Sequence, residues 1–338
     1  MQGMIEELSN LMGVSGAEKD VRNYILEQIK PYATDITVDT MGNVIAFKKG
    51  KAGYQTIMVS AHMDEVGFII TDITDKGYLK FATVGGIDPK ILVSKRVKVG
   101  KDKNDGVIGI KAIHLQSKEE KSGKVSLKNL YIDIGCSKKE EAEKKASIGD
   151  YAGFAPRYMT LGNNIVSKAL DDRIGCALLI ELMKDTYDPD VYFCFTVQEE
   201  VGLRGAKVAT HRIKPDFTIA VETTTCNDVA DAKEHEFSTI YGAGAVLTLM
   251  DRSSMSDAKM ITNLYKKAKS LGIPVQYKTL AKGGNDTGAM QTAAGGAKSV
   301  SLSIACKYIH SPVCMANKED IHSLYSTVKL CIKEGCLS

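Results

Sequence analysis

The feature that most constrains the fold of this chain is the alternation, after residue 163, of long helical patterns with short apolar runs. Residues 171–185 (DDRIGCALLIELMKD) have the apolar spacing of a helix, and residues 191–197 (VYFCFTV) are apolar almost throughout. Such apolar runs are typical of parallel strands buried on both faces of a sheet. Helices between these strands predict a three-layer α/β fold with a mixed, mainly parallel sheet. The alternation continues with predicted strands at 217–222, 274–278 and 298–305, helices at 256–272 and 317–335, and a helical turn at 285–294.

The first part of the chain belongs to the same architecture. A region with a different pattern of short strands and turns then interrupts it. Residues 1–30 predict two helices. From about residue 72 to residue 163 the predicted strands are short and are separated by Gly, Asp and Lys turns, with one polar helix near 137–147. We therefore expect a discontinuous αβα domain, formed by residues 1–71 and 164–338, with a small inserted β-barrel-like domain at 72–163. The strands predicted before the insertion lie at 35–40, 42–49, 56–61 and 66–73.

Composition is that of an ordinary globular protein and gives no sign of a nucleic-acid or membrane partner. Of the 338 residues 44% are hydrophobic and 25% are charged, and the net charge of +3 is too small to favour nucleic acid or an anionic membrane. No apolar run approaches the roughly 20 residues that cross a bilayer. The acidic N-terminus is typical of an amphipathic helix and not of a signal peptide, and the eight cysteines include no CxxC pair. These features predict a cytoplasmic protein whose thiols are reduced and mostly buried.

Two of the six histidines follow predicted buried strands and are therefore candidates for a functional site. His62 directly follows the strand at 56–61 and stands two residues before Asp64, and His310 follows the strand at 298–305. Ligands of open α/β sheets bind beyond the carboxyl ends of the strands, where these two imidazoles are expected. A single histidine in such a place is more often structural than catalytic, so its position has to be supported by neighbouring chemistry.

Acidic residues at equivalent positions supply that chemistry. Glu199 and Glu200 follow one predicted strand, and Glu222 ends the next. A carboxylate beside a core is costly unless it is paired, hydrogen-bonded or bound to a metal. Because adjacent side chains of a strand point to opposite sides, Glu199 and Glu200 are expected to differ in role, one as a metal ligand and one facing water. Asp171 and Asp172 begin a helix, where one of the two could serve only as an N-cap.

Together these side chains suit a pair of divalent metal ions. Two imidazoles with three or more carboxylates are ligands that Zn²⁺, Co²⁺ and Mn²⁺ accept, and no sulfur is required. Two divalent ions would be balanced by three carboxylates and a bridging hydroxide, whereas a single ion would leave carboxylates uncompensated. Two ions therefore fit better than one. The candidate residues are His62, Asp64, Asp171, Glu199, Glu200, Glu222 and His310.

Five short segments, in the same order along the chain, resemble the motifs of the two-metal aminopeptidases that include the tetrahedral (TET) and glutamyl aminopeptidases. The resemblance covers nearly the whole chain, and the predicted β-rich insertion lies where this family has one. It implies the same αβα fold with an inserted domain. The segments are SAHMDEVG, ALDDRIG, VQEEVGLRGA, AVETTT and YIHSP.

The resemblance also implies which residues hold the ions. Asp171 would bridge both of them. His62 and Glu222 would complete one site, and Glu200 and His310 would complete the other. Zn²⁺ is the preferred ion, with Co²⁺ or Mn²⁺ as alternatives, because nitrogen and oxygen ligands accept several metals.

Further roles follow from the same resemblance. Glu199 would act as the general base, and Asp64 would orient His62 through its second ring nitrogen. A cis peptide bond would join Asp171 to Asp172. The implied reaction is the hydrolysis of the N-terminal peptide bond of a short peptide by a water molecule that the metal ions activate.

Three other functions stay open at the level of the sequence. A metal-dependent deacylase or carboxypeptidase would use the same scaffold without requiring a free α-amine. A glycoside hydrolase would use paired carboxylates but would need neither His62 nor His310, and it would stay active after chelation. A non-enzymatic binding protein would have a degenerate metal site, whereas every expected ligand here is a competent one.

The resemblance also implies a homo-oligomer. In the TET aminopeptidases the inserted domain helps to assemble dimers into a hollow tetrahedral dodecamer that admits only short peptides, although a lid is a simpler role for such a domain. The preferred N-terminal residue of the substrate is not predicted, because it depends on the shape and charge of the pocket near residues 283–310.

Overall fold

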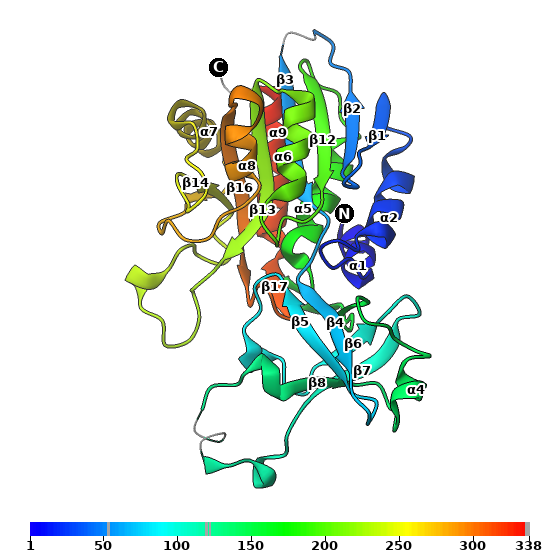
Figure 1. Ribbon diagram of the computed structural model, residues 1–338. Coiled ribbons are helices and arrows are strands. Elements are labelled where there is room, and N and C mark those ends of the chain that lie inside the picture. The colour runs from blue at the N-terminus through cyan, green and yellow to red at the C-terminus, as the bar shows by residue number, and fades with distance from the viewer. Residues whose placement is uncertain (53–54, 119–120, 122, 335–338) are drawn as a thin grey trace.

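The computed structural model describes residues 1–52, 55–118, 121 and 123–334, which form two bodies (Figure 1). In these residues the upper body is an α/β domain on an eleven-stranded mixed sheet, and the lower body is a closed barrel of six antiparallel strands. This arrangement confirms the predicted fold class. Residue 335, the last of the predicted closing helix, lies outside the described residues.

Four parallel strands form the centre of the large sheet, in the order β12, β3, β13 and β16. Their register aligns Thr196 with His62 and Glu222 with Ser303, so their carboxyl ends meet at one edge of the sheet. Antiparallel strands flank this centre on both sides. The strands of this sheet are β1 (Asp35–Val38), β2 (Val44–Lys48), β3 (Thr56–His62), β10 (Met159–Leu161), β11 (Asn164–Ser167), β12 (Asp190–Thr196), β13 (Phe217–Thr225), β14 (Ala245–Thr248), β15 (Val275–Tyr277), β16 (Lys298–Lys307) and β17 (Cys314–Asn317).

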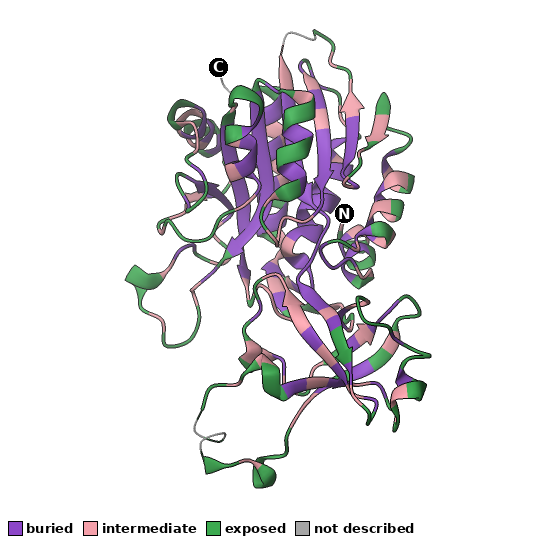
Figure 2. Ribbon diagram, viewed as in Figure 1, coloured by how far each residue is buried: buried purple, intermediate pink, exposed green. Residues whose placement is uncertain are grey.

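Helices cover both faces of this sheet. Helices α5 and α9 pack on one face together with α1, α2 and α7, and α6 and α8 pack on the other. The central strands are therefore buried on both faces (Figure 2), which is why their sequences are apolar and do not alternate. The helices of this domain are α1 (Gln2–Asn10), α2 (Lys19–Ile29), α5 (Leu170–Leu182), α6 (Arg204–Ile213), α7 (Ala258–Ser270), α8 (Thr287–Thr292) and α9 (Lys318–Lys333).

The barrel has an apolar core of its own. Phe68 lies between Phe81 and Phe154 in edge-to-face contacts, with ring centroids 5.1 and 5.3 Å apart. The barrel begins with β4 at Gly67, ahead of the boundary expected at residue 72, and the chain is back in the large sheet by β10. Its elements are β4 (Gly67–Ile73), β5 (Leu79–Val84), β6 (Arg96–Val99), β7 (Asn104–Ile110), β8 (Leu130–Asp133), β9 (Tyr151–Phe154) and the short helix α4 (Lys139–Ala142).

Four strands of the large sheet were not predicted, namely β10, β11, β14 and β17. Each has only three or four residues, which is too short for an alternation of apolar and polar residues to show. Of the cysteines in the described part of the chain, Cys136 is half-buried and the rest are buried, as predicted. No helix among the described residues combines the length and the apolar character that crossing a bilayer requires.

Candidate metal centre

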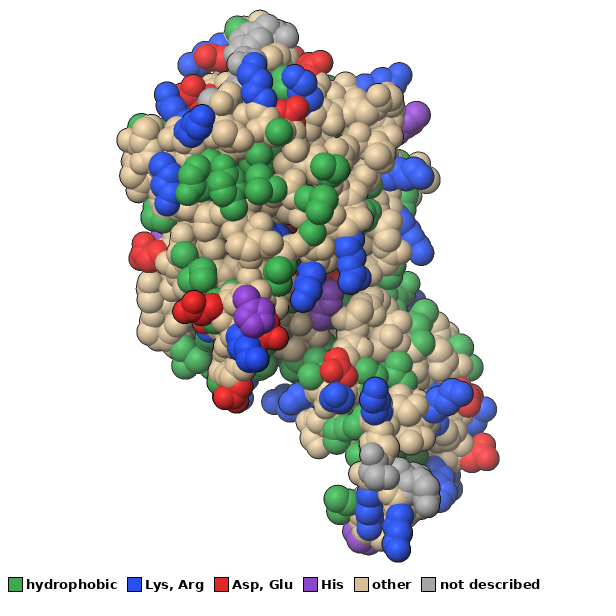
Figure 3. Space-filling model, turned by 90° about the vertical axis from the view of Figure 1, so that its left-hand side faces the viewer, with side chains coloured by type: hydrophobic (Ala, Val, Ile, Leu, Met, Phe, Trp, Pro, Cys, Tyr) green, Lys and Arg blue, Asp and Glu red, His purple; other side chains and the backbone are tan. Residues whose placement is uncertain are grey.

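The predicted metal ligands and Glu199 line one cavity of about 150 Å³. Strands β3, β12, β13 and β16 contribute from their carboxyl ends or the residues that follow, and α5 contributes from its first turn. Figure 3 shows a hollow between the two bodies, with histidine, lysine and arginine side chains around it. The structure brings together His62 of β3, Asp171 of α5, Glu199 and Glu200 after β12, Glu222 of β13 and His310 after β16.

His62 is almost fully buried and directs one ring nitrogen at the acidic residues. Its Nε2 atom lies 3.5 Å from Oδ1 of Asp171 and 3.7 Å from Oε2 of Glu222. Its Nδ1 atom lies 3.0 Å from the backbone carbonyl oxygen of Asp64. A carbonyl oxygen only accepts hydrogen bonds, so the contact requires a proton on Nδ1 and, in the neutral ring, leaves the lone pair on Nε2 for an ion.

His310 repeats this arrangement on the other side of Asp171. Its Nε2 atom lies 3.2 Å from Oε2 of Glu200 and 3.6 Å from Oδ2 of Asp171. Its Nδ1 atom lies 2.7 Å from the backbone carbonyl oxygen of Gly86, which belongs to the barrel. Asp171 therefore presents one carboxylate oxygen to each histidine, an arrangement that a bridging ligand would need.

The charges around Asp171 shift the pKa of each group in the metal-free protein. Burial raises the pKa of the Asp171 carboxyl, but His310 and His62 outweigh it and hold this pKa well below its usual range. Burial lowers the pKa of His310, but Asp171 and Glu200 outweigh it and raise this pKa to about 11. Without an ion, the protonated imidazoles therefore supply the positive charge that balances the carboxylates.

The donor set fits divalent ions better than it fits hydrogen bonds alone. Most of its nitrogen–oxygen distances, between 3.2 and 3.7 Å, are long for hydrogen bonds. Two ligands about 2.0–2.1 Å from one tetrahedral ion are about 3.3–3.4 Å apart, within this range. The Oε1 atom of Glu222 is buried and has no hydrogen-bond partner among the described residues. Two groups of residues each offer three ligand atoms that lie within 4.8 Å of one another. The first group is His62, Asp171 and Glu200, and the second is His62, Asp172 and Glu222.

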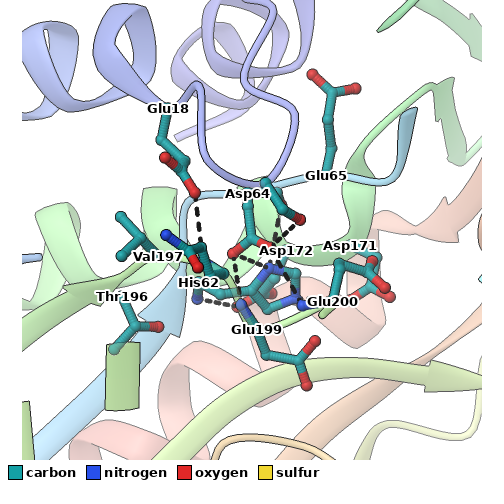
Figure 4. Close-up of polar contacts among 12 residues, drawn as sticks. Glu18, His62, Asp64, Glu65, Asp171, Asp172, Thr196, Val197, Glu199 and Glu200 are labelled. Carbon is teal, nitrogen blue, oxygen red and sulfur yellow. Dashed lines mark hydrogen bonds and ion pairs between the residues drawn. The ribbon is translucent and has the colours of Figure 1, made fainter. Parts of the chain in front are cut away.

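Asp64 holds the backbone of the glutamate pair. Its carboxylate accepts hydrogen bonds from the backbone N–H groups of Glu199 and Glu200, at 3.0 and 3.1 Å, and from the hydroxyl of Ser15 at 2.6 Å (Figure 4). Its Oδ1 atom is 3.5 Å from Nδ1 of His62, farther than the carbonyl oxygen of the same residue. Asp64 thus orients His62 mainly through its backbone and the glutamates through its side chain.

The glutamate pair lies in a turn and not at the end of a strand. Strand β12 ends at Thr196, and Gln198 has a φ of 56°, in the left-handed region. The alternation of side chains that the sequence suggested for Glu199 and Glu200 therefore does not apply, because it holds only within a strand. In Figure 4 the carboxylate of Glu199 points away from Asp64. The two glutamates still face different neighbours, but the turn and Asp64 set their directions.

The structure shows which aspartate caps the helix. Asp172 is fully buried and accepts hydrogen bonds from the backbone N–H groups of Gly175, at 3.0 Å, and His62, at 3.3 Å. Asp171 precedes it through a cis peptide bond, as the resemblance implied, and turns towards the histidines. Ser15 and Gly86 were not predicted as part of the site. Backbone carbonyl contacts such as that of Gly86 leave no mark in a sequence.

Comparison with known proteins assigns the chain to a family. The family model of the M42 glutamyl aminopeptidases matches residues 42–327. A putative aminopeptidase of Acetivibrio thermocellus is 41% identical over 338 residues, which cover 99% of this chain and 98% of that protein. The lysyl aminopeptidase of Pyrococcus furiosus is 31% identical, over 98% of this chain and 96% of that protein. The solved structure of the Pyrococcus horikoshii TET1 peptidase has a TM-score of 0.87 and 34% identity, over 98% of this chain and 99% of that chain.

The region matched by the family model takes in the whole candidate site, from His62 to His310. The relatives match over nearly their full lengths, so the likeness includes the barrel as well as the α/β domain. The chain therefore belongs to the M42 glutamyl aminopeptidase family.

Proposed function

We propose that this aminopeptidase uses two divalent metal ions and a glutamate base to remove the N-terminal residue from short peptides. The observation that carries the proposal is the position of Asp171, whose two carboxylate oxygens lie 3.5 and 3.6 Å from the Nε2 atoms of His62 and His310. One ion would be held by His62, Asp171 and Glu222, and the other by His310, Asp171 and Glu200. Zn²⁺, Co²⁺ and Mn²⁺ all suit this ligand set.

Bound in this site, the ions would lower the pKa of a water molecule and polarise the scissile carbonyl. The protein itself moves the proton. Glu199 accepts the proton of the attacking water on its carboxylate and transfers it to the nitrogen of the leaving amine. Burial raises the pKa of the Glu199 carboxyl in the metal-free protein, so this carboxylate is a stronger base than that of an exposed glutamate. Catalysis of this kind contributes about 10²- to 10⁴-fold to the rate.

The replacement Glu199→Gln tests the role of the base. The variant should keep two ions per chain, measured by inductively coupled plasma mass spectrometry. Its turnover rate should fall by about 10²- to 10⁴-fold. Glu181→Gln is the matched control, because Glu181 lies on α5 in an ion pair with Lys184 and outside the cavity. Near-normal turnover of a Glu199→Gln variant that holds both ions would remove Glu199 from the mechanism.

Chelation separates this function from its rivals. The chelated enzyme should be inactive on a panel of aminoacyl p-nitroanilides, and zinc, cobalt or manganese, added back one at a time, should restore activity. A glycoside hydrolase would survive the chelator. An N-acetylated peptide should be inert, because an aminopeptidase needs a free α-amine, whereas a deacylase would cleave it.

We also propose that the protein assembles into a homo-oligomer, with a tetrahedral dodecamer as the specific expectation. The TET1 peptidase of Pyrococcus horikoshii, which matches over 98% of this chain, is described as assembling into a tetrahedron or a large octahedral shell. A hollow particle would restrict the enzyme to short peptides. Sedimentation at micromolar concentration measures the mass, and a persistent monomer would contradict the assembly.

A further inference from the structure

The half of the centre formed by Glu200 and His310 is completed by the inserted barrel. Gly85 and Gly86 follow β5, directly before the turn that leads to the rest of the barrel. The carbonyl oxygen of Gly86 lies 2.7 Å from Nδ1 of His310, across the boundary between the two bodies. The corresponding contact of His62 comes from Asp64, two residues further along the same segment. Only one of the two histidines is therefore oriented by the barrel.

The loop that carries His310 does not fix this side chain by itself. Tyr308 and His310 have φ values of 60° and 61°, in the left-handed region that residues other than glycine rarely adopt. Such a backbone persists only when its surroundings determine it. The His310 side chain is also 35% exposed, so packing restrains its ring less than it restrains that of His62, which is 2% exposed. The hydrogen bond to Gly86 is thus a principal restraint on the direction of Nε2.

Gly85 fixes the position of this carbonyl. Its φ of +82° favours glycine, and a Cβ atom there would lie 2.7 Å from Cγ1 of Val66 and 3.3 Å from Cβ of Glu200. At Gly86 a Cβ atom would lie 3.6 Å from Nδ1 of His310, which is an ordinary contact, and φ is not positive. A side chain at position 85 would therefore displace the segment from Glu200, whereas a methyl group at position 86 would not.

We propose that the inserted domain is a working part of the metal centre. Through Gly85 and Gly86 it positions Glu200 and His310, so that affinity for the ion of this half depends on the position of the barrel relative to the α/β domain. Affinity for the ion of the His62 half is independent of the position of the barrel. This inference rests on the proposed two-metal function, and it makes Gly85 and Gly86 positioning residues and not ligands.

Calorimetric titration of the chelator-stripped protein with Co²⁺ tests the inference without an activity assay. Wild type should bind two ions per chain. Gly85→Ala should bind the ion of the His62 half as wild type does and the ion of the His310 half about ten- to a hundredfold less tightly, as is usual when a group behind a ligand is lost. Gly3→Ala in α1 is the matched control, because a Cβ atom there would meet nothing within 4 Å, and it should stay within about threefold of wild type for both ions.

A second variant decides the question if Gly85→Ala does not fold. Position 86 is exposed and its φ is not positive, so valine fits the backbone there, but its methyl groups would lie against the His310 ring. Gly86→Val should therefore also weaken only the ion of the His310 half. The inference would be overturned if Gly86→Val and any folded Gly85→Ala bound both ions as tightly as wild type. It would also be overturned if these variants weakened both ions equally. Fewer than two ions in wild type would instead contradict the two-metal function.

Discussion

The two halves of the proposed metal centre differ in burial and in the domain that supports them. The side chain of His62 is 2% exposed and is oriented by its own domain, whereas that of His310 is 35% exposed and is oriented by the barrel. Their ligand chemistry is otherwise alike, because each directs Nε2 at Asp171 and at one glutamate. The difference therefore lies in the surroundings and not in the donor atoms.

Burial gives the two halves different requirements. Burial raises the pKa of the Glu222 carboxyl well above its usual range, and one of its oxygens has no partner among the described residues. An ionised carboxylate in such a place is costly without a cation, and the raised pKa means that it takes up a proton more readily when no ion is bound. In the other half the His310 side chain is 35% exposed, although its partners Glu200 and Asp171 are only 5% and 13% exposed, so water reaches this half from the side of the histidine. We expect the buried half to hold its ion more tightly than the exposed half.

The largest expected effect comes from replacing the histidine of each half. His62→Ala removes the buried imidazole beside Glu222 and Asp64 and leaves Asp171 with His310, and it should lower the free energy of unfolding of the metal-free protein by about 3–5 kcal/mol. His310→Ala removes an ion pair whose histidine is 35% exposed and whose Glu200 is 5% exposed, and it should lower the free energy of unfolding by less, about 1–3 kcal/mol. Chemical denaturation of the metal-free proteins measures both changes.

The exposed His322 of α9 supplies the control, and His322→Ala should stay within about 0.5 kcal/mol of wild type. Metal analysis adds a second comparison, since His310→Ala should keep one ion per chain and His62→Ala should lose the ion of the buried half. Equal losses of stability in His62→Ala and His310→Ala would show that burial does not distinguish the halves.

The next effect is the pH dependence of metal binding. In the metal-free protein the pKa of His310 is raised to about 11, and that of His62 is raised well above its usual value because Asp171 and Asp64 outweigh its burial. Both rings are therefore protonated at neutral pH, and each ion must displace a proton. Affinity for each ion should rise about tenfold per pH unit between about pH 6 and 8. Titration calorimetry in buffers of different ionisation enthalpy measures the protons released.

The same shifts set the sign of the pH dependence of folding without metal. A histidine whose pKa is raised on folding stabilises the protein fully below its unfolded value of 6.5, and this contribution is lost as the pH rises towards about 11. The metal-free protein should therefore become less stable between neutral and alkaline pH.

For the metal titrations, binding without release of protons would contradict the protonation of both rings.

The sequence predicted which side chains meet but not what holds them. Parallel strands end at one edge of a sheet, so a histidine or glutamate after an apolar run could be placed there from sequence alone, as His62 and Glu222 were. The roles within each pair came from resemblance to the family. The turn at Gln198 was not predicted, because its left-handed φ depends on the contacts around it and not on a local pattern.

The supporting contacts were beyond prediction for a physical reason. Gly86 acts through a backbone carbonyl, which every residue carries, and it comes from a domain that is separate in space. Ser15 reaches Asp64 from the N-terminal segment, 49 positions away, and its sequence context is that of a helix start. Contacts of this kind depend on the packing of distant segments, which periodicity and motif spacing do not encode.

The smallest expected effect distinguishes a support shared by both halves from one that serves a single half. Ser15 donates a hydrogen bond of 2.6 Å to Asp64, which contacts His62 and holds the backbone of Glu200. Ser15→Ala should lower the free energy of unfolding by about 1.5 kcal/mol, the lower end for a hydrogen bond to a charged group. It should weaken both ions by similar factors, in contrast to Gly85→Ala.

The control for this variant is Ser326→Ala, because in the described part of the chain the half-buried Ser326 hydroxyl bonds within α9, to the carbonyl of His322 at 2.9 Å. It should leave both ions and the free energy of unfolding unchanged within about 0.5 kcal/mol. Calorimetric titration with Co²⁺ and chemical denaturation measure the two quantities. If Ser15→Ala weakened only the ion of the His62 half, Asp64 would serve the histidine alone, and the turn that carries Glu199 and Glu200 would have to be held by other contacts.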